Sequence, residues 1–219
     1  MLERISRREE ADLFVAWIAI SVAFTIIFIS PGGLLSFSPR INALDALVFF
    51  GISLVTVGIG FILHEMAHKF TAIRFGYWAE FRKDNMMLLV AVALAALVGI
   101  VFAAPGATVI YNNAMYGRGI SREENGKISA AGPVTNLLLC VPFAGLLLYG
   151  GMTEAYGNSL FAMIGMVGLQ VNAMIATFNM LPISILDGKK VLAWNPAIFV
   201  ILIAAAFGTL LATFYPYLL

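Results

Sequence analysis

Charged residues, cysteine and histidine are all scarce in this chain of 219 residues. Charged side chains make up 11% of it and hydrophobic ones 61%, against about 25% and 45–50% in soluble domains. This balance excludes an ordinary water-soluble globule and predicts an integral membrane protein. The single cysteine, Cys140, excludes an intramolecular disulfide, and its apolar neighbours predict a buried packing role. The net charge of +1 gives no reason to expect a nucleic-acid partner.

Six apolar segments cover most of the chain, each close to the roughly 20 residues that a helix needs to cross a bilayer. They lie at residues 12–30, 44–66, 86–104, 128–150, 159–181 and 196–219. Turn-forming residues are found at 31–33, 150–151 and 195–196. The first run is longer than the core of a signal peptide, so we expect an uncleaved first span. The expected fold is an all-α polytopic membrane protein with five to six transmembrane helices.

The basic residues favour five full crossings over six. If residues 86–104 enter and leave the membrane on one side, all 13 lysines and arginines except Arg40 face the cytoplasm. That segment would be re-entrant, and protein or a water-filled cavity would have to shield it, because unpaired backbone groups are costly in lipid. The N-terminus would then be cytoplasmic in a multi-pass protein of the cell membrane. The alternative is a sixth ordinary span.

Residues 104–111 combine a Pro105-Gly106 turn with residues that favour a strand. They predict a short membrane-associated β-hairpin, whose exposed edge would be able to add an extended peptide as a further strand. A plain interfacial loop is the alternative. Residues 77–82 mix aromatic and charged types, which is typical of an interfacial segment.

The only two histidines fall in one string, His64-Glu65-Met66-Ala67-His68, near the end of the second apolar segment. At a spacing of four residues the two imidazoles project from one helix face about one turn apart, so both can bind one zinc ion. Glu65 would stand beside the metal as a base. The alternative is a pair of histidines that only pack between helices. A catalytic zinc site also needs a third protein ligand.

Few ionisable side chains lie in or beside the apolar segments, so few can supply that ligand. Asp45 begins the second segment about five helical turns from His64, too far along the same helix to share a metal, and a cap or interfacial role is expected for it. Asp187 follows a helix that Pro182 interrupts and precedes Gly188, so its carboxylate can turn inward. With five crossings, Asp187 lies on the same side of the membrane as the two histidines. The alternative is a capping or loop aspartate beside lysines.

Three motifs in this order resemble the site-2 protease family of intramembrane zinc metalloproteases. They are the His64–His68 string, a Gly-Pro-x-x-Asn element that ends at Asn136, and an Asn-x-x-Pro-x-x-x-x-Asp-Gly element that starts at Asn179. The resemblance covers about residues 50–190. It implies one Zn²⁺ per chain held by His64, His68 and Asp187, with Glu65 as the catalytic glutamate. It also implies substrate or transition-state contacts by Asn136 and Asn179, and motif residues that shape the site, namely Gly132, Pro133, Pro182 and Gly188.

The function that this resemblance implies is that of an intramembrane metalloendopeptidase, which hydrolyses peptide bonds in or near transmembrane helices. The expected partners are a transmembrane-helix protein substrate and the lipid bilayer, and no nucleic acid. We expect one membrane-embedded protease domain over residues 1–219, with a catalytic core at about 44–190 between spans at 12–30 and 196–219. The alternative is a membrane metal transporter or metal-binding protein that uses the same His/Asp cluster. Glu65 discriminates between the two, because a transporter does not need a base that binds no metal.

Overall fold

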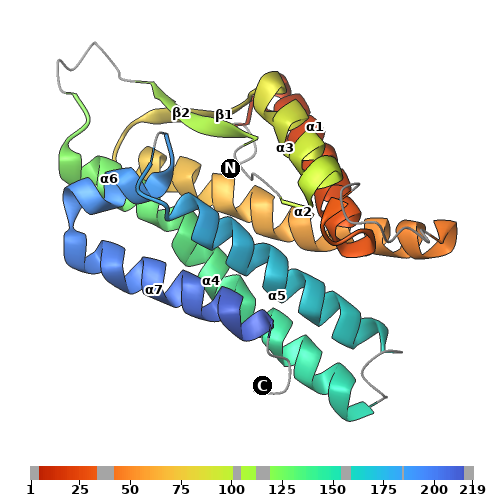
Figure 1. The fold of residues 1–219 in the computed structure, drawn as a ribbon. Coiled ribbons are helices and arrows are strands. Elements are labelled where there is room, and N and C mark those ends of the chain that lie inside the picture. The colour runs from red at the N-terminus through yellow and green to blue at the C-terminus, as the bar shows by residue number, and fades with distance from the viewer. Residues whose placement is uncertain are drawn as a thin grey trace.

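The computed structural model describes residues 5–33, 42–100, 105–111, 119–153, 159–183 and 185–214, and it consists of helices with one small sheet (Figure 1). The elements in chain order are α1 (Arg7–Ile29), α2 (Ala43–Arg74), β1 (Trp78–Lys83), α3 (Asn85–Val98), β2 (Gly106–Tyr111), α4 (Arg122–Thr153), α5 (Leu160–Asn179), α6 (Asp187–Trp194) and α7 (Pro196–Thr213).

Five of these helices are long and apolar enough to cross a membrane, namely α1, α2, α4, α5 and α7. The predicted all-α polytopic membrane protein is therefore confirmed. The third apolar segment forms α3, which has only 14 residues and is about 21 Å long at 1.5 Å per residue. A helix of that length does not cross a hydrocarbon core of about 30 Å. Instead α3 packs along α1 (Figure 1).

Two of the three predicted turns separate helices, and one does not. Residues 31–33 follow α1, and Asn195 caps the start of α7 through hydrogen bonds from the backbone N–H groups of Ala197 and Ile198. The turn predicted at residues 150–151 is wrong, because α4 continues to Thr153. In an apolar environment a helix hydrogen-bonds its own backbone N–H and C=O groups, whereas a turn would leave some of them without partners. This gain in hydrogen bonding is larger than the preference of two glycines for a turn.

The predicted strand at β2 is confirmed, but its partner differs from a local hairpin. Antiparallel pairing joins β2 to β1, with Trp78 opposite Tyr111 and Lys83 opposite Gly106. The connection between the strands contains the whole of α3 (Figure 1). The interfacial segment expected at residues 77–82 is thus mostly strand β1, in which Ala79 and Phe81 are buried. Pairing across α3 is a tertiary contact that no local sequence pattern predicts.

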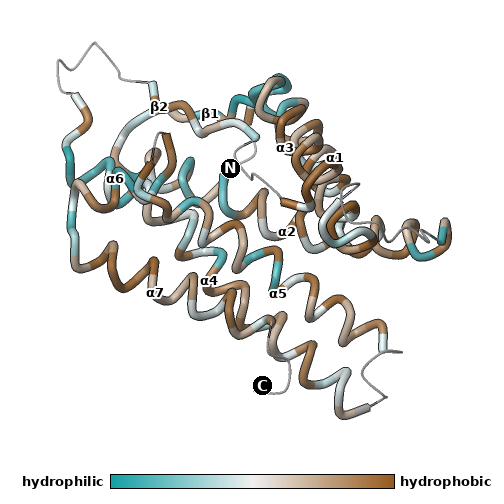
Figure 2. Tube along the Cα trace, viewed as in Figure 1, coloured by the Kyte–Doolittle hydropathy of each residue, from teal (hydrophilic) through white to brown (hydrophobic). Residues whose placement is uncertain are grey.

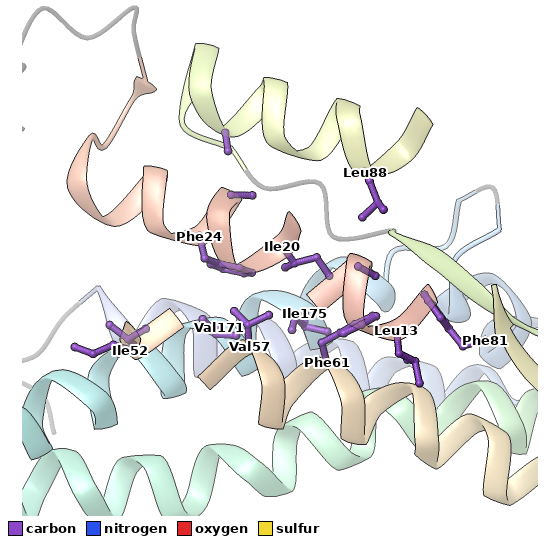
Figure 3. Packing of buried hydrophobic residues seen from close by; sticks show 14 of the residues in the cluster. Leu13, Ile20, Phe24, Ile52, Val57, Phe61, Phe81, Leu88, Val171 and Ile175 are labelled. Carbon is purple, nitrogen blue, oxygen red and sulfur yellow. The ribbon is translucent and has the colours of Figure 1, made fainter. Parts of the chain in front are cut away.

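The main hydrophobic core lies between α1, α2 and α5. Figure 3 shows side chains from these helices directed toward one another, together with Phe81 of β1 and Leu88 of α3. Cys140 belongs to a second buried cluster between α4 and α5, which confirms its packing role. Figure 2 shows predominantly hydrophobic residues along α7 and hydrophilic residues gathered on α6. The polar part of the fold therefore lies at the end that carries α6.

A fully buried ion pair joins three elements near this polar end. Glu9 of α1 and Lys69 of α2 contact each other with no exposed side-chain surface, and Glu9 Oε1 also accepts a hydrogen bond of 3.0 Å from the backbone N–H of Phe81 in β1. Removing one partner of such a pair typically costs about 3–5 kcal/mol, because the other charge stays buried. Lys69 directly follows His68, so the pair holds α1 and the sheet against the helix that carries both histidines.

Candidate metal centre

The structure brings the two histidines of α2 and the first residue of α6 into one cluster. The Nε2 atoms of His64 and His68 lie 3.0 Å apart, and Asp187 Oδ2 lies 3.5 Å from the first and 3.1 Å from the second. All three residues are buried, and each offers one ligand atom within 4.8 Å of the others. Two imidazole nitrogens and one carboxylate oxygen form a donor set typical of catalytic zinc.

The second ring nitrogen of each histidine shows that this cluster fits a metal. His64 Nδ1 contacts the side-chain oxygen of Asn136, and His68 Nδ1 lies 2.7 Å from the backbone carbonyl oxygen of Ile128. Both oxygens accept hydrogen bonds, so each Nδ1 carries the proton and donates it. The Nε2 atom of each ring then faces the cluster, and it is the ring atom left to bind a metal. This arrangement of the outer hydrogen bonds is the usual one for zinc-binding histidines.

Two motif glycines allow other helices to approach the cluster closely. A Cβ atom added to Gly132 of α4 would lie 2.4 Å from His68 Nε2 and 2.6 Å from His64 Nε2, so any side chain there would collide with the ligands. A Cβ atom on Gly188 would lie 2.1 Å from the backbone oxygen of Met180. Gly188 therefore lets α6 start directly beside the end of α5. The motif residues Pro133, inside α4, and Pro182, between α5 and α6, lie next to these contacts.

Asp187 is ionised in this setting. Burial raises the pKa of its carboxyl, but the neighbouring His68 and His64 outweigh burial, so the pKa lies below its usual range. Lys190 adds a further cation, with its Nζ atom 3.9 Å from Asp187 Oδ1. A charged carboxylate is the form that binds a metal.

Glu65 lies beside the cluster and contacts a residue that the sequence did not single out. Its Oε2 atom accepts a hydrogen bond of 2.8 Å from the hydroxyl of Thr108 in β2. Glu65, Thr108 and the three clustered residues line one small pocket of about 50 Å³. A single water needs at least about 10–15 Å³, so the pocket has room for one next to the Glu65 carboxylate. A lone threonine in a strand carries no sequence signal for this contact.

The two motif asparagines lie in different surroundings. Asn136 is fully buried, and its amide nitrogen donates to the backbone oxygen of Gly60 at 3.1 Å and to the side-chain oxygen of Asn172 at 2.8 Å. Its oxygen accepts from the ligand His64, and Asn136 is not among the residues that line the pocket. Asn179 does line the pocket, and its amide nitrogen donates to the backbone oxygen of Ile175 at 3.0 Å. Asn172 is a further polar residue of the site, and no sequence motif indicates it.

We expect Asn136→Ala to weaken zinc binding by about 10–100-fold, the usual effect of losing the partner of a zinc-binding histidine. Asn136→Asp keeps an acceptor for His64 Nδ1 and should bind zinc almost as tightly as the wild type. Competition with a fluorescent chelator measures both affinities. Asn179→Ala is the matched control, because Asn179 contacts no ligand residue in the described hydrogen bonds. Wild-type affinity in Asn136→Ala would contradict this positioning role.

Five apolar helices and a buried His/His/Asp cluster with an adjacent glutamate define a polytopic membrane protein with a hydrolase-type zinc site. The names of two curated relatives agree with a zinc site of this kind. The chain is 39% identical over 198 residues, 90% of each chain, to "Putative zinc metalloprotease MJ0611" of Methanocaldococcus jannaschii. It is 26% identical over 168 residues to "Putative zinc metalloprotease YwhC" of Bacillus subtilis, covering 68% of this chain and 73% of that protein.

The chain belongs to this family of zinc metalloproteases, and zinc is the metal that its cluster binds. No family model and no solved structure matches it.

Proposed function

We propose that this metalloprotease is an intramembrane endopeptidase of the site-2 protease type, which hydrolyses peptide bonds in or near transmembrane helices. One observation carries the proposal. His64, Glu65 and His68 belong to a helix that is long and apolar enough to cross a membrane, and they are buried where Asp187 meets them from α6. A soluble protein substrate has no direct route to such a site. A membrane-spanning segment that diffuses in the bilayer does.

Each residue of the site has a definable part in peptide hydrolysis. His64, His68 and Asp187 would hold the zinc ion, which would supply a Lewis acid for the attacking water and the scissile carbonyl. Glu65 takes a proton from that water and passes it to the leaving amine. The hydroxyl of Thr108 keeps the Glu65 carboxylate turned toward the pocket.

The two motif asparagines, Asn179 and Asn136, have different roles in the proposed reaction. An amide nitrogen carries two donors, and Asn179 uses one for Ile175, so the second can stabilise the oxyanion or the stretched substrate backbone. Asn136 holds His64 in the orientation and tautomer that bind the metal.

The proposed setting is the cell membrane, with the N-terminus and the active site toward the cytoplasm. The excess of lysine and arginine in the segments assigned to the cytoplasm supports this orientation. The gathering of hydrophilic residues on α6, beside the metal centre, supports an interface with water at that end (Figure 2). Hydrolysis consumes water, so the pocket needs such access. The substrate helix must also unwind locally before its backbone reaches the metal, because a helix buries its own peptide hydrogen bonds.

Removal of zinc tests this function directly. We expect the purified protein in detergent to cut a tagged single-span substrate, to lose this activity in the presence of a zinc chelator, and to regain it when zinc is restored. Cleavage is read from the tagged fragments on a gel. The same peptide sequence fused to a soluble carrier, without its membrane span, should be cut far more slowly. Cleavage that resists the chelator would contradict the metalloprotease, and equal cleavage of both substrates would contradict the intramembrane role.

A further inference from the structure

A second hollow, of about 740 Å³, adjoins the pocket of the metal centre. Ser121, just before α4, lines it together with Arg122 and Asn125 of α4, and α6 lines it with Lys189 and Lys190. The hollow shares three of its lining residues with the metal-site pocket, namely Ala107, Ile185 and Lys190. A peptide that lies across the metal centre therefore reaches this hollow directly. Its volume is in the range of sites that hold small ligands or side chains.

The charged residues of the hollow are all cationic. Arg122, Lys189 and Lys190 line it, and no carboxylate does among the described residues. Lys190 lies near Asp187, whereas Arg122 and Lys189 form no ion pair with any residue in the described part of the chain. Arg122 also opens the 32-residue helix α4, whose backbone dipole is positive at this end, and the acidic Glu123 and Glu124 of the same turn do not line the hollow. Ser121 and Asn125 supply polar groups beside these charges.

We propose that this hollow, the basic subsite, binds an acidic side chain of the substrate close to the scissile bond. The inference rests on the proposed endopeptidase function, since it assigns a feature of the substrate to the same active site. Complementary charge favours the encounter and sets the register in which a substrate lies. The subsite adjoins the metal-site pocket and shares lining residues with it, so an aspartate or glutamate a few residues from the scissile bond of an extended substrate reaches the subsite.

A general excess of basic residues at this end of the molecule would act differently. Lys127 also lies on α4 and is exposed, but it pairs with Glu123 and does not line the hollow. A diffuse surface charge would depend on Lys127 as much as on Lys189. Recognition in the basic subsite depends on the cations that line it, Arg122, Lys189 and Lys190, and not on Lys127. Lys127 is therefore the matched control.

The experiment compares two forms of one single-span substrate, with aspartate or asparagine placed in turn at each of the four positions on either side of the cleaved bond. We expect the wild type to cut the aspartate form about two- to fivefold more efficiently in kcat/KM at one or more positions at low salt, the range of exposed ion pairs. Lys189→Gln and Arg122→Gln should each reduce this ratio toward one, and Lys127→Gln should leave it unchanged. Lys189→Glu should reverse the preference in favour of lysine at the same position.

Three results would overturn the basic subsite. The first is cleavage by the wild type with no charge preference at any position. The second is an equal loss of preference in Lys127→Gln. The third is a rate that depends on anionic lipid in mixed micelles and on Lys189 but not on substrate charge, which would assign the hollow to a lipid headgroup. Each of these leaves the proposed endopeptidase intact, whereas an absence of zinc-dependent cleavage of any form would contradict the function itself.

Discussion

Glu65→Gln is expected to abolish peptide cleavage while the protein keeps its zinc. Glutamine has nearly the same shape and can still accept the hydrogen bond of Thr108, but it cannot take a proton from water. Loss of a general base typically lowers the rate by about 10²–10⁴-fold. Glu65 is not one of the three clustered ligand residues, so zinc affinity should stay close to that of the wild type.

Two measurements on the same preparation check this expectation. Zinc per chain is determined by elemental analysis, and cleavage is followed with the tagged single-span substrate. Glu123→Gln serves as the control, because Glu123 is an exposed carboxylate that pairs with Lys127 away from the pocket. Cleavage that persists in Glu65→Gln would refute the mechanism. Zinc binding without cleavage in both the wild type and Glu65→Gln would favour a metal-transport site, which needs no base.

Asp187→Ala is expected to lower zinc affinity by at least about 100-fold and to remove cleavage with it. Removing the outer-shell partner of a zinc ligand typically lowers zinc affinity by about 10–100-fold. Removing a ligand itself should lower the affinity by at least as much. Without Asp187 the described cluster retains two nitrogen donors, and a catalytic zinc site requires three protein ligands. The two-histidine remnant should release zinc to a moderate chelator that the wild type resists.

The control for this variant is Asp45→Ala. Asp45 also lies in the first turn of a helix, α2, but it is exposed and far from the cluster. It should bind zinc and cut substrate as the wild type does. Thermal unfolding of both variants without metal separates a lost ligand from a lost fold, because an intact fold leaves the apo transition unchanged. Unchanged zinc stoichiometry and affinity in a folded Asp187→Ala would remove Asp187 from the site.

The sequence predicted much of the site because the chemistry is carried by few residues in short patterns. Two histidines four residues apart on a helix must share a face, whatever surrounds them. Asp187 could be singled out because carboxylates are rare in apolar segments and because Pro182 and Gly188 break the helix beside it. The positions that the sequence assigned least well are the asparagines. Asn136 and Asn179 carry the same side chain in similar motifs, yet one faces a ligand and the other faces the pocket.

By itself, then, the sequence determined the membrane class, the apolar helices and the residue types that can bind zinc. These follow from composition and from helical spacing, which are local properties. Only the tertiary structure decided that β1 pairs with β2 across α3, that Thr108 meets Glu65, and that Glu9 forms a buried ion pair with Lys69. These contacts join residues at least 23 positions apart, the separation of the paired Lys83 and Gly106. The choice among such partners depends on packing and burial, for which local sequence patterns hold no information.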